Sequence, residues 1–209
     1  MSFNIAIDGP AGAGKSTIAK RVSKELGFIY VDTGAMYRAM ALYFLRSNIS
    51  NEDEQAISRA SENVEITIQY ENGEQQVFLN GENVNSKIRT EEVGRLASRL
   101  ATSTVVRDCL KEAQRSLGES GLVAEGRDMG TVVFPTARFK FFLDARPEVR
   151  GMRRFEELQA KGEPADLAQI TEMIRQRDDM DRNRAVAPLK PAADAVIVDT
   201  SDLGIEGVL

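Results

Sequence analysis

Short apolar runs recur along this chain of 209 residues, separated by longer stretches in which apolar residues return every three or four positions. Continuous apolar runs are typical of buried parallel strands, whereas the longer spacing is typical of helices that pack on a sheet. The pattern therefore predicts an α/β fold built on one parallel sheet. The expected strands are residues 5–8, 28–32, 122–125, 139–144 and 195–199.

Four of these runs end in a carboxylate, namely Asp8, Asp32, Glu125 and Asp144. Ligands of parallel sheets collect at the carboxyl ends of the strands, where a carboxylate can hold the water shell of Mg²⁺ or cap a helix. Capping is the more common role for any one of them.

One stretch has a different period, because apolar residues at 64, 66, 68 and 70 alternate with polar ones. Two Asn-Gly pairs, at 72–73 and 80–81, favour tight hairpin turns. The stretch therefore predicts a small antiparallel sheet within about residues 62–89. Since it lies between the second and third parallel strands, we expect an insert that covers an acceptor site. A surface hairpin without a role in binding is the alternative.

Two further helices are expected near residue 150. Pro147 suits the first turn of one, residues 161–164 break the chain, and Asp166 caps a second helix that continues to Asp181. Two helices joined by a short hinge predict a mobile lid at about residues 147–184. The core of the single expected domain is then about residues 1–61, 90–146 and 185–209.

The first predicted strand leads into Gly9-Pro-Ala-Gly-Ala-Gly-Lys-Ser16, a complete GxxxxGK(S/T) phosphate loop, and then into a helix that ends at Gly27. Amides of such a loop wrap a polyphosphate, while Lys15 reaches the outer phosphates and Ser16 holds Mg²⁺. The loop therefore predicts binding of a nucleoside triphosphate. A glycine-rich turn with an unrelated lysine is disfavoured, because strand, loop and helix signals agree.

Composition limits the partners and the compartment. The net charge of −5, from 27 basic and 32 acidic residues, disfavours a general nucleic-acid-binding surface. The single cysteine, Cys109, cannot form an internal disulfide and shares a helical face with apolar residues, so we expect it in the core. With no signal segment and no apolar run long enough to span a bilayer, we expect a cytoplasmic protein without a membrane partner.

The chain contains no histidine. This excludes general acid–base catalysis by imidazole, Ser-His-Asp triads and histidine zinc sites. Phosphoryl transfer remains, because positioning, Mg²⁺ and cationic side chains supply most of its catalysis.

Arg177, Asp181 and Arg184 stand at i, i+4 and i+7, on one face of the second lid helix if it continues that far. A solvated ion-pair ladder is the usual explanation of such a pattern. Here the charged cluster is followed directly by Ala-Val-Ala-Pro-Leu, which indicates that the segment turns into the protein. We therefore interpret the three side chains as parts of one site.

Two more charged segments leave the carboxyl ends of predicted strands. Arg127 and Asp128 follow the third strand, while Thr33, the expected N-cap of a helix, and Arg38 follow the second. Arginine suits bidentate recognition of phosphate, and an aspartate can accept a hydrogen bond from an exocyclic amino group. Both segments therefore predict contacts with an acceptor substrate.

Together these segments resemble the bacterial type of cytidylate kinase, within the nucleoside monophosphate kinase group of P-loop proteins. The resemblance covers nearly the whole chain and is carried by residues 7–17, 32–38, 87–93, 125–135 and 177–189. The last two segments, in this order and spacing, are specific to the family. The resemblance implies a three-layer P-loop fold with a five-stranded parallel sheet, a small antiparallel insert that binds the monophosphate, and a short helical lid.

The resemblance also implies the reaction, which is transfer of the γ-phosphoryl group of ATP to CMP or dCMP with Mg²⁺ as cofactor. On the donor side it implies catalytic roles for Lys15, Arg153 and Arg154 in addition to Arg184, with Arg150 in the same lid and Mg²⁺ on Ser16. The implied ATP ligands are Gly9, Pro10, Ala11, Gly12, Ala13, Gly14, Lys15, Ser16 and Thr17.

On the acceptor side the resemblance implies three groups of ligands. The implied ligands of the CMP phosphate are Thr33, Arg38, Arg127 and Arg184, those of the sugar are Tyr37, Arg177 and Asp181, and those of the cytosine are Ser98, Arg107 and Asp128. An ionised carboxylate beside a guanidinium fits the amino donor and ring-nitrogen acceptor of cytosine and repels the reversed pattern of uracil. UMP should therefore be a poor substrate.

Other acceptors and another class of protein stay open as alternatives. The acceptor could be UMP, AMP or the hydroxyl of a metabolite, or the chain could be a nucleotide-dependent switch, although it lacks an Asn-Lys-x-Asp signature. We expect a monomer, because no exposed apolar face is obvious. A last helix should begin just after Asp202, and relatives usually extend it beyond the point that Leu209 reaches.

Overall fold

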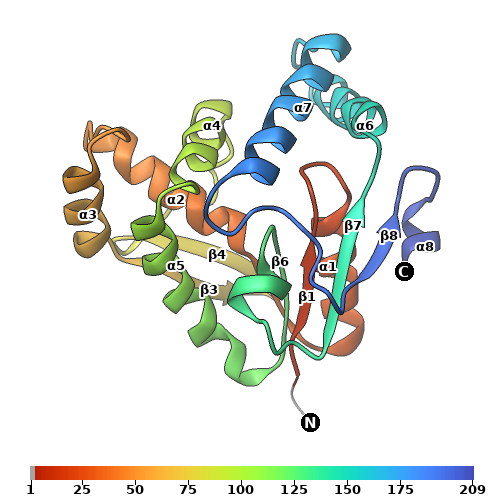
Figure 1. Ribbon diagram of the computed structural model, residues 1–209, viewed down its shortest axis with the longest axis horizontal. Coiled ribbons are helices and arrows are strands. Elements are labelled where there is room, and N and C mark those ends of the chain that lie inside the picture. Colours follow the sequence, from red (N-terminus) through yellow and green to blue (C-terminus); the bar gives the residue numbers. More distant parts are fainter. Residues whose placement is uncertain (1–2) are drawn as a thin grey trace.

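A computed structural model describes residues 3–209 and places the predicted strands in one parallel sheet of order β2-β6-β1-β7-β8. The α/β prediction is confirmed, and each strand begins within one residue of its expected start (Figure 1). The strands are β1 (Ile5–Asp8), β2 (Ile29–Asp32), β6 (Leu122–Gly126), β7 (Phe139–Asp144) and β8 (Val196–Asp199).

Alternate residues of the central strand separate two core clusters, which makes the fold three-layered. Ile5 and Ile7 of β1 pack with residues of α1 (Lys15–Leu26) on one face of the sheet. Ala6 lies between them and packs on the other face with η2 (Met129–Val133), a short π-helical turn. Because β1 is central and apolar on both faces, the loop that follows it is supported from two sides.

A third and larger core holds together the insert and four of the helices that follow β2. Cys109 is half-buried against this core, in agreement with its predicted structural role. The helices concerned are α2 (Thr33–Arg46), α3 (Glu54–Asn63), α4 (Glu91–Leu100) and α5 (Thr104–Ser116), with η1 (Leu117–Ser120) after α5.

The alternating stretch forms the predicted antiparallel sheet, with strands β3 (Ile66–Glu71), β4 (Glu74–Leu79) and β5 (Glu82–Asn83). Both Asn-Gly pairs adopt positive φ, as tight hairpin turns require. The insert is joined to the edge of β2 by side chains, since the Gln75 amide accepts from the Asp32 N–H (2.7 Å) and donates to its carbonyl (3.1 Å). The insert therefore supports the end of β2, from which α2 begins.

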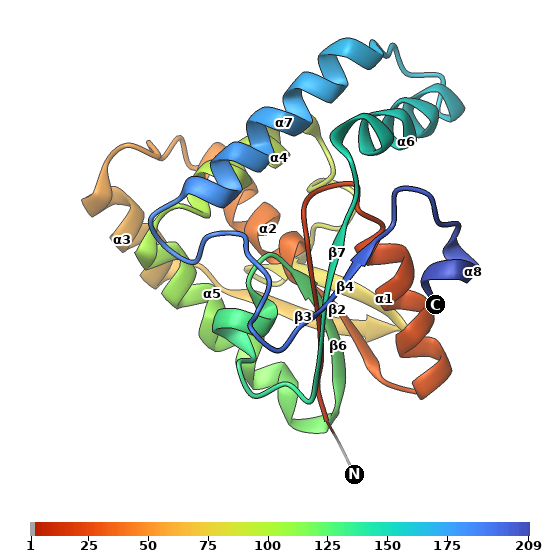
Figure 2. The same ribbon diagram turned by 45° about the vertical axis from the view of Figure 1, so that its right-hand side comes forward.

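The two predicted lid helices, α6 (Pro147–Ala160) and α7 (Leu167–Asn183), lie side by side beyond the carboxyl ends of the strands (Figures 1 and 2). Asp166 caps α7 through the Gln169 N–H, as the sequence predicts. Gly151 of α6 allows the close approach, because a Cβ there would lie 2.3 Å from the Thr171 hydroxyl oxygen. The two helices are thus tightly packed against each other, and their role as a mobile lid stays a prediction.

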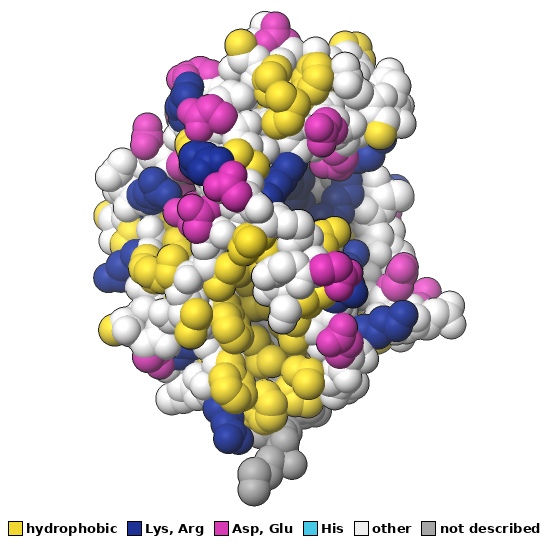
Figure 3. Space-filling view, turned by 90° about the vertical axis from the view of Figure 1, so that its right-hand side faces the viewer, with side chains coloured by type: hydrophobic (Ala, Val, Ile, Leu, Met, Phe, Trp, Pro, Cys, Tyr) yellow, Lys and Arg dark blue, Asp and Glu magenta, His cyan; other side chains and the backbone are white. Residues whose placement is uncertain are grey.

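The far edge of the sheet differs from one expectation. Val196 and Ile197 of the edge strand β8 are 57% and 64% exposed, and apolar side chains gather on this face (Figure 3). The premise that no apolar face is exposed is therefore wrong, and the monomeric state stays a prediction. The last helix, α8 (Ile205–Val208), follows β8. Among residues 3–209, no helix is both long and apolar enough to cross a membrane.

Candidate functional site

The phosphate loop is a tight connection between β1 and α1. Gly9, Gly12 and Gly14 all have positive φ, at 146°, 78° and 92°. A Cβ on Gly9 would lie 1.9 Å from the carbonyl oxygen of Leu143 in β7. Only glycine fits at this position, because the loop must turn where β1 is pressed against its neighbour strand.

Side chains from several elements hold four consecutive carbonyl groups of the loop. Fixed carbonyls set the orientation of the peptide planes and leave the N–H groups for an anion, which an α-helix N-terminus also favours. The four hydrogen bonds run from Lys15 Nζ to Pro10 (2.7 Å), Arg150 Nη1 to Ala11 (3.0 Å), Arg153 Nη1 to Gly12 (3.4 Å) and Thr200 Oγ1 to Ala13 (3.1 Å).

Lys15 is buried beside the loop, and its positive charge is poorly solvated. Burial, together with the nearby guanidinium of Arg127, lowers the pKa of Lys15 to about 7. Glu125, at the end of β6, is also buried, which raises the pKa of its carboxyl. An incoming polyanion would restore the charged state of Lys15.

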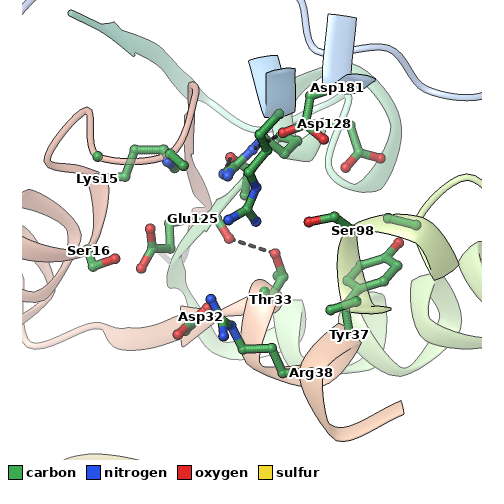
Figure 4. A pocket seen from close by; sticks show the side chains of 18 of the residues that line it. Lys15, Ser16, Asp32, Thr33, Tyr37, Arg38, Ser98, Glu125, Asp128 and Asp181 are labelled. Carbon is green, nitrogen blue, oxygen red and sulfur yellow. Dashed lines mark hydrogen bonds and ion pairs between the residues drawn. The ribbon is translucent and has the colours of Figure 1, made fainter. Parts of the chain in front are cut away.

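Ser16 and Glu125 face each other beside the loop (Figure 4). A hydroxyl and a carboxylate are hard oxygen donors that fit Mg²⁺, which keeps several waters and takes further oxygens from phosphates. Within residues 3–209, no group of three or more Asp, Glu, His or Cys side chains could hold a metal ion without a substrate. The donor set thus suits a metal that arrives with a nucleotide.

A cavity of about 220 Å³ opens from the loop toward α2, α4, α5 and α7. Every acceptor-side residue predicted from the sequence lines this cavity, together with Lys15 and Ser16 (Figure 4). These residues are Thr33, Tyr37, Arg38, Ser98, Arg107, Arg127, Asp128, Arg177, Asp181 and Arg184.

The middle of the cavity is strongly cationic. Arg177 and Arg184 each have a buried nitrogen, Nε and Nη2 respectively, with no hydrogen-bond partner among the described residues. Burial and the neighbouring Arg127 lower the pKa of Arg177 to about 10. Unpaired guanidinium donors in a buried site are stabilised by a multivalent anion such as phosphate.

Asp181 organises these arginines. Its carboxylate accepts from Arg127 Nε (2.9 Å) and lies 3.7 Å from Arg184 Nη1. Burial alone raises the pKa of Asp181, but the charges of Arg127 and Arg177 outweigh burial and hold it below its ordinary value. The ionised carboxylate therefore fixes the arginines where a substrate would meet them.

The far end of the cavity contains a buried ion pair between Arg107 of α5 and Asp128, which follows β6. Arg107 also donates to the carbonyl of Ala101 (3.1 Å), and Asp128 lies 4.0 Å from Arg184 Nη2. Ser98 lines the same end, and its hydroxyl donates to Gly94 within α4 (3.1 Å). This end thus presents a fixed donor and a fixed acceptor side by side.

Two details at α2 and α7 correct the sequence predictions. The N-cap of α2 is Asp32, which accepts from the Ala35 N–H (3.0 Å), whereas Thr33 begins the helix and donates to the Glu125 carbonyl (2.6 Å). Asp32 is the cap because its carboxylate accepts from a backbone N–H of the first turn, whereas the Thr33 hydroxyl is turned toward Glu125. The helix α7 ends at Asn183, one residue before Arg184, whose extended backbone still leads its side chain into the cavity.

The lid arginines lie outside the cavity in this structure. Arg150 is buried in an ion pair with Asp178, and Arg153 donates to Thr200 as well as to the loop. Arg154 pairs with Glu157 on the surface (2.8 Å). The catalytic roles of Arg153 and Arg154 stay predictions.

Several residues of the site were not among the predicted substrate ligands. Glu125 and Asp32 line the cavity, and the sequence predicted either binding of Mg²⁺ waters or helix capping for such strand-end carboxylates. For Asp32 the capping role is confirmed, since it caps α2. From the insert region, Arg89 lines the cavity and pairs with Asp32 (3.2 Å). Asp8, another strand-end carboxylate, accepts from the N–H groups that begin η2, so for it the capping role is confirmed.

Comparisons with known proteins agree with this geometry. A family model described as Cytidylate kinase matches residues 5–209. A cytidylate kinase from Nitratidesulfovibrio vulgaris is 55% identical over 98% of this chain and 88% of its own, and one from Oleidesulfovibrio alaskensis is 49% identical over 98% and 93%. An uncharacterised protein from Eubacterium ventriosum has a solved structure with a TM-score of 0.50 at 10% identity, over 99% and 93% of the two chains, which concerns the fold alone.

Proposed function

Since this chain belongs to the cytidylate kinase family and phosphorylates CMP with ATP as donor, we propose that its two substrates meet between the phosphate loop and the cationic cavity. The observation that carries this proposal is the continuity of one cavity from Lys15 and Ser16 to the Arg107–Asp128 pair. Its one end suits a triphosphate and its other end suits a base. The middle, where the arginines gather, is then the place of phosphoryl transfer.

In this proposal the phosphates of ATP lie in the loop of residues 9–17. The loop amides bind the phosphate oxygens. Lys15, whose protonated state the polyanion favours, neutralises the outer phosphates. Ser16, with Glu125 beside it, would hold Mg²⁺, which would supply Lewis-acid polarisation of the phosphates.

The acceptor phosphate of CMP lies among Arg38, Arg127 and Arg184, with the Thr33 N–H at the start of α2 as a further donor. One of its oxygens attacks the γ-phosphorus, and the bond from that phosphorus to the β-phosphate oxygen of ATP breaks. The phosphate is already ionised, so no general base is needed, and the guanidiniums stabilise the charge that spreads over the transferring group. Tyr37, Arg177 and Asp181 flank the sugar.

The base lies against Ser98 and the Arg107–Asp128 pair. The Asp128 carboxylate accepts from the exocyclic amino group of cytosine, while Arg107 donates to the ring nitrogen and the carbonyl. Uracil would place a carbonyl against the carboxylate and an N–H against the guanidinium. A buried polar site left mismatched in this way discriminates by about 10² to 10⁵.

A panel of acceptors tests the proposal. We expect ADP formation from ATP to be fast with CMP or dCMP, slow with UMP or AMP, and near zero without an acceptor. Faster turnover of UMP or AMP would refute the base assignment. Strong hydrolysis of ATP that CMP does not change would instead support a nucleotide-dependent switch.

A further inference from the structure

Arg150 of α6 is the largest fully buried side chain among the described residues, yet it does not line the cavity. Its guanidinium donates to the carbonyls of Ala145 (2.7 Å) and Ala11 (3.0 Å) and forms a bidentate ion pair with Asp178 of α7. One side chain therefore connects the end of β7, the phosphate loop and the second lid helix.

The backbone on both sides of Arg150 is closely packed. A Cβ on Gly12 of the loop would lie 3.1 Å from Arg150 Cβ, so the loop touches the base of the side chain. The close contact of Gly151 with Thr171 presses α6 against α7 on the other side. Loop, α6 and α7 thus pack as one unit around the ion pair.

Asp178 stands on the helix that carries the acceptor ligands. Arg177 is its neighbour in sequence, and Asp181, which holds Arg127, lies about one turn further along α7. A shift of Asp178 relative to Arg150 would therefore move Arg177 and Asp181, and the cavity arginines that Asp181 holds, relative to the loop that carries Ala11.

Stability alone is a weak reason for this arrangement. Replacing a buried ion pair by apolar residues of similar volume is often neutral or stabilising, although removal of one partner is costly. The three connections of Arg150 point instead to geometry, because a guanidinium can satisfy a carboxylate and two carbonyls at fixed angles and an apolar side chain cannot.

We propose that Arg150 and Asp178 form a strut that sets the position of the acceptor arginines relative to the phosphate loop, and so aligns the two phosphates for transfer. Both are positioning residues, since neither contacts a proposed substrate. The inference rests on the proposed function above, in that it takes the loop as the donor site and the cavity as the acceptor site.

The decisive variant is the double replacement Arg150→Met with Asp178→Leu, compared with Asp178→Asn and with the wild type. We expect Asp178→Asn to lower both the melting temperature and kcat. The double variant should regain most of the melting temperature, because no buried charge is left unpaired. Its kcat with CMP should stay at least about 10-fold below wild type, since misplacement of reacting groups by about 1 Å can cost about 10²-fold in rate.

Binding of CMP without ATP shows whether a lower kcat comes from lost alignment of the two phosphates or from damage to the acceptor site. Its Kd, measured by calorimetry, should change less than about 3-fold in the double variant, because the cavity ligands remain. A Kd that rises as much as kcat falls would overturn the proposal, and so would a double variant with the kcat of the wild type. Arg150→Lys adds a milder test, since it keeps the charge but loses the fork; an unchanged kcat in that variant also counts against the strut.

A matched control is available on the same two helices. Glu148 of α6 and Arg175 of α7 form an exposed ion pair (2.5 Å; side chains 60% and 49% exposed) that does not touch the loop. Glu148→Gln should leave kcat and the melting temperature nearly unchanged. The wild-type assay with CMP distinguishes failure of the proposed function from failure of the strut proposal. No turnover by the wild type refutes the proposed function, whereas turnover retained in the double variant refutes the strut alone.

Discussion

Replacing Asp128 by Asn tests how this protein recognises its base. The substitution keeps the shape of the side chain but removes its charge and turns one acceptor oxygen into a donor NH₂ group. An amide can rotate to accept from the amino group of cytosine or to donate to the carbonyl of uracil. We therefore expect Asp128→Asn to relax the preference for CMP over UMP more than it weakens binding of ATP.

The magnitude follows from the burial of the pair. The side chains of Asp128 and Arg107 are 4% and 7% exposed, so neither is screened by solvent. A good bidentate contact to a base discriminates by about 1–3 kcal/mol. Loss of the charged acceptor should thus lower the ratio of kcat/KM for CMP and UMP by about 10- to 100-fold, which corresponds to about 1.4–2.8 kcal/mol.

The assay is steady-state ADP production with each acceptor, accompanied by thermal unfolding to detect general damage. Removal of one partner of a buried pair leaves Arg107 with the Ala101 carbonyl and destabilises the protein, so activities should be compared well below the melting temperature. Asp108→Asn is the control, because Asp108 is 60% exposed on α5 and pairs with Lys111. An unchanged selectivity ratio in Asp128→Asn would refute base recognition by this carboxylate.

Three other perturbations test the phosphate loop and its support. Lys15→Ala should lower kcat by about 10²-fold or more with little change in far-UV circular dichroism, and near-normal turnover would contradict the loop assignment. Gly9→Ala should destabilise by about 3 kcal/mol or more and abolish ATP binding, because its Cβ would meet the Leu143 carbonyl at 1.9 Å; Gly204→Ala, with no atom within 4 Å of its Cβ, should be harmless in the same melting and binding measurements. Burial raises the pKa of Asp8 from 3.8 to about 6. The contribution of this carboxyl to stability is therefore present below pH 3.8 and is lost as the pH rises through about 6. The free energy of unfolding of Asp8→Asn, measured in urea and taken relative to wild type, should thus rise by up to about 3 kcal/mol between about pH 4 and about pH 7. If this difference between variant and wild type does not change with pH, Asp8 does not titrate in this way.

The local pattern of the chain was sufficient for the elements of the fold. Buried parallel strands leave continuous apolar runs, and the Asn-Gly pairs at 72–73 and 80–81 specify tight turns through their own backbone preferences. The phosphate loop was equally clear, because its glycines and Lys15 act within a few residues of one another. Because these signals are local, they can be recognised in the sequence without knowledge of the fold.

The acceptor ligands depended on family-specific segments as well as on local pattern. Arg127 and Arg184 are far apart in sequence, and only the packing of α7 over the carboxyl end of β6 brings them to one carboxylate. Ser98 and Arg107 carry no distinctive local signal, and only the resemblance pointed to them.

What the tertiary structure alone decided are the partners of the charged groups. The sequence places Arg150, Arg153 and Arg154 on one helix, where the local pattern does not separate them, yet the first is buried with Asp178, the second donates to Thr200 and the third is exposed. Hydrogen bonds and ion pairs between distant segments depend on which surfaces meet and on how much water remains between them. Charge and spacing along the chain define which groups are available, whereas burial in the folded protein determines which of them bind a substrate and which hold the site in place.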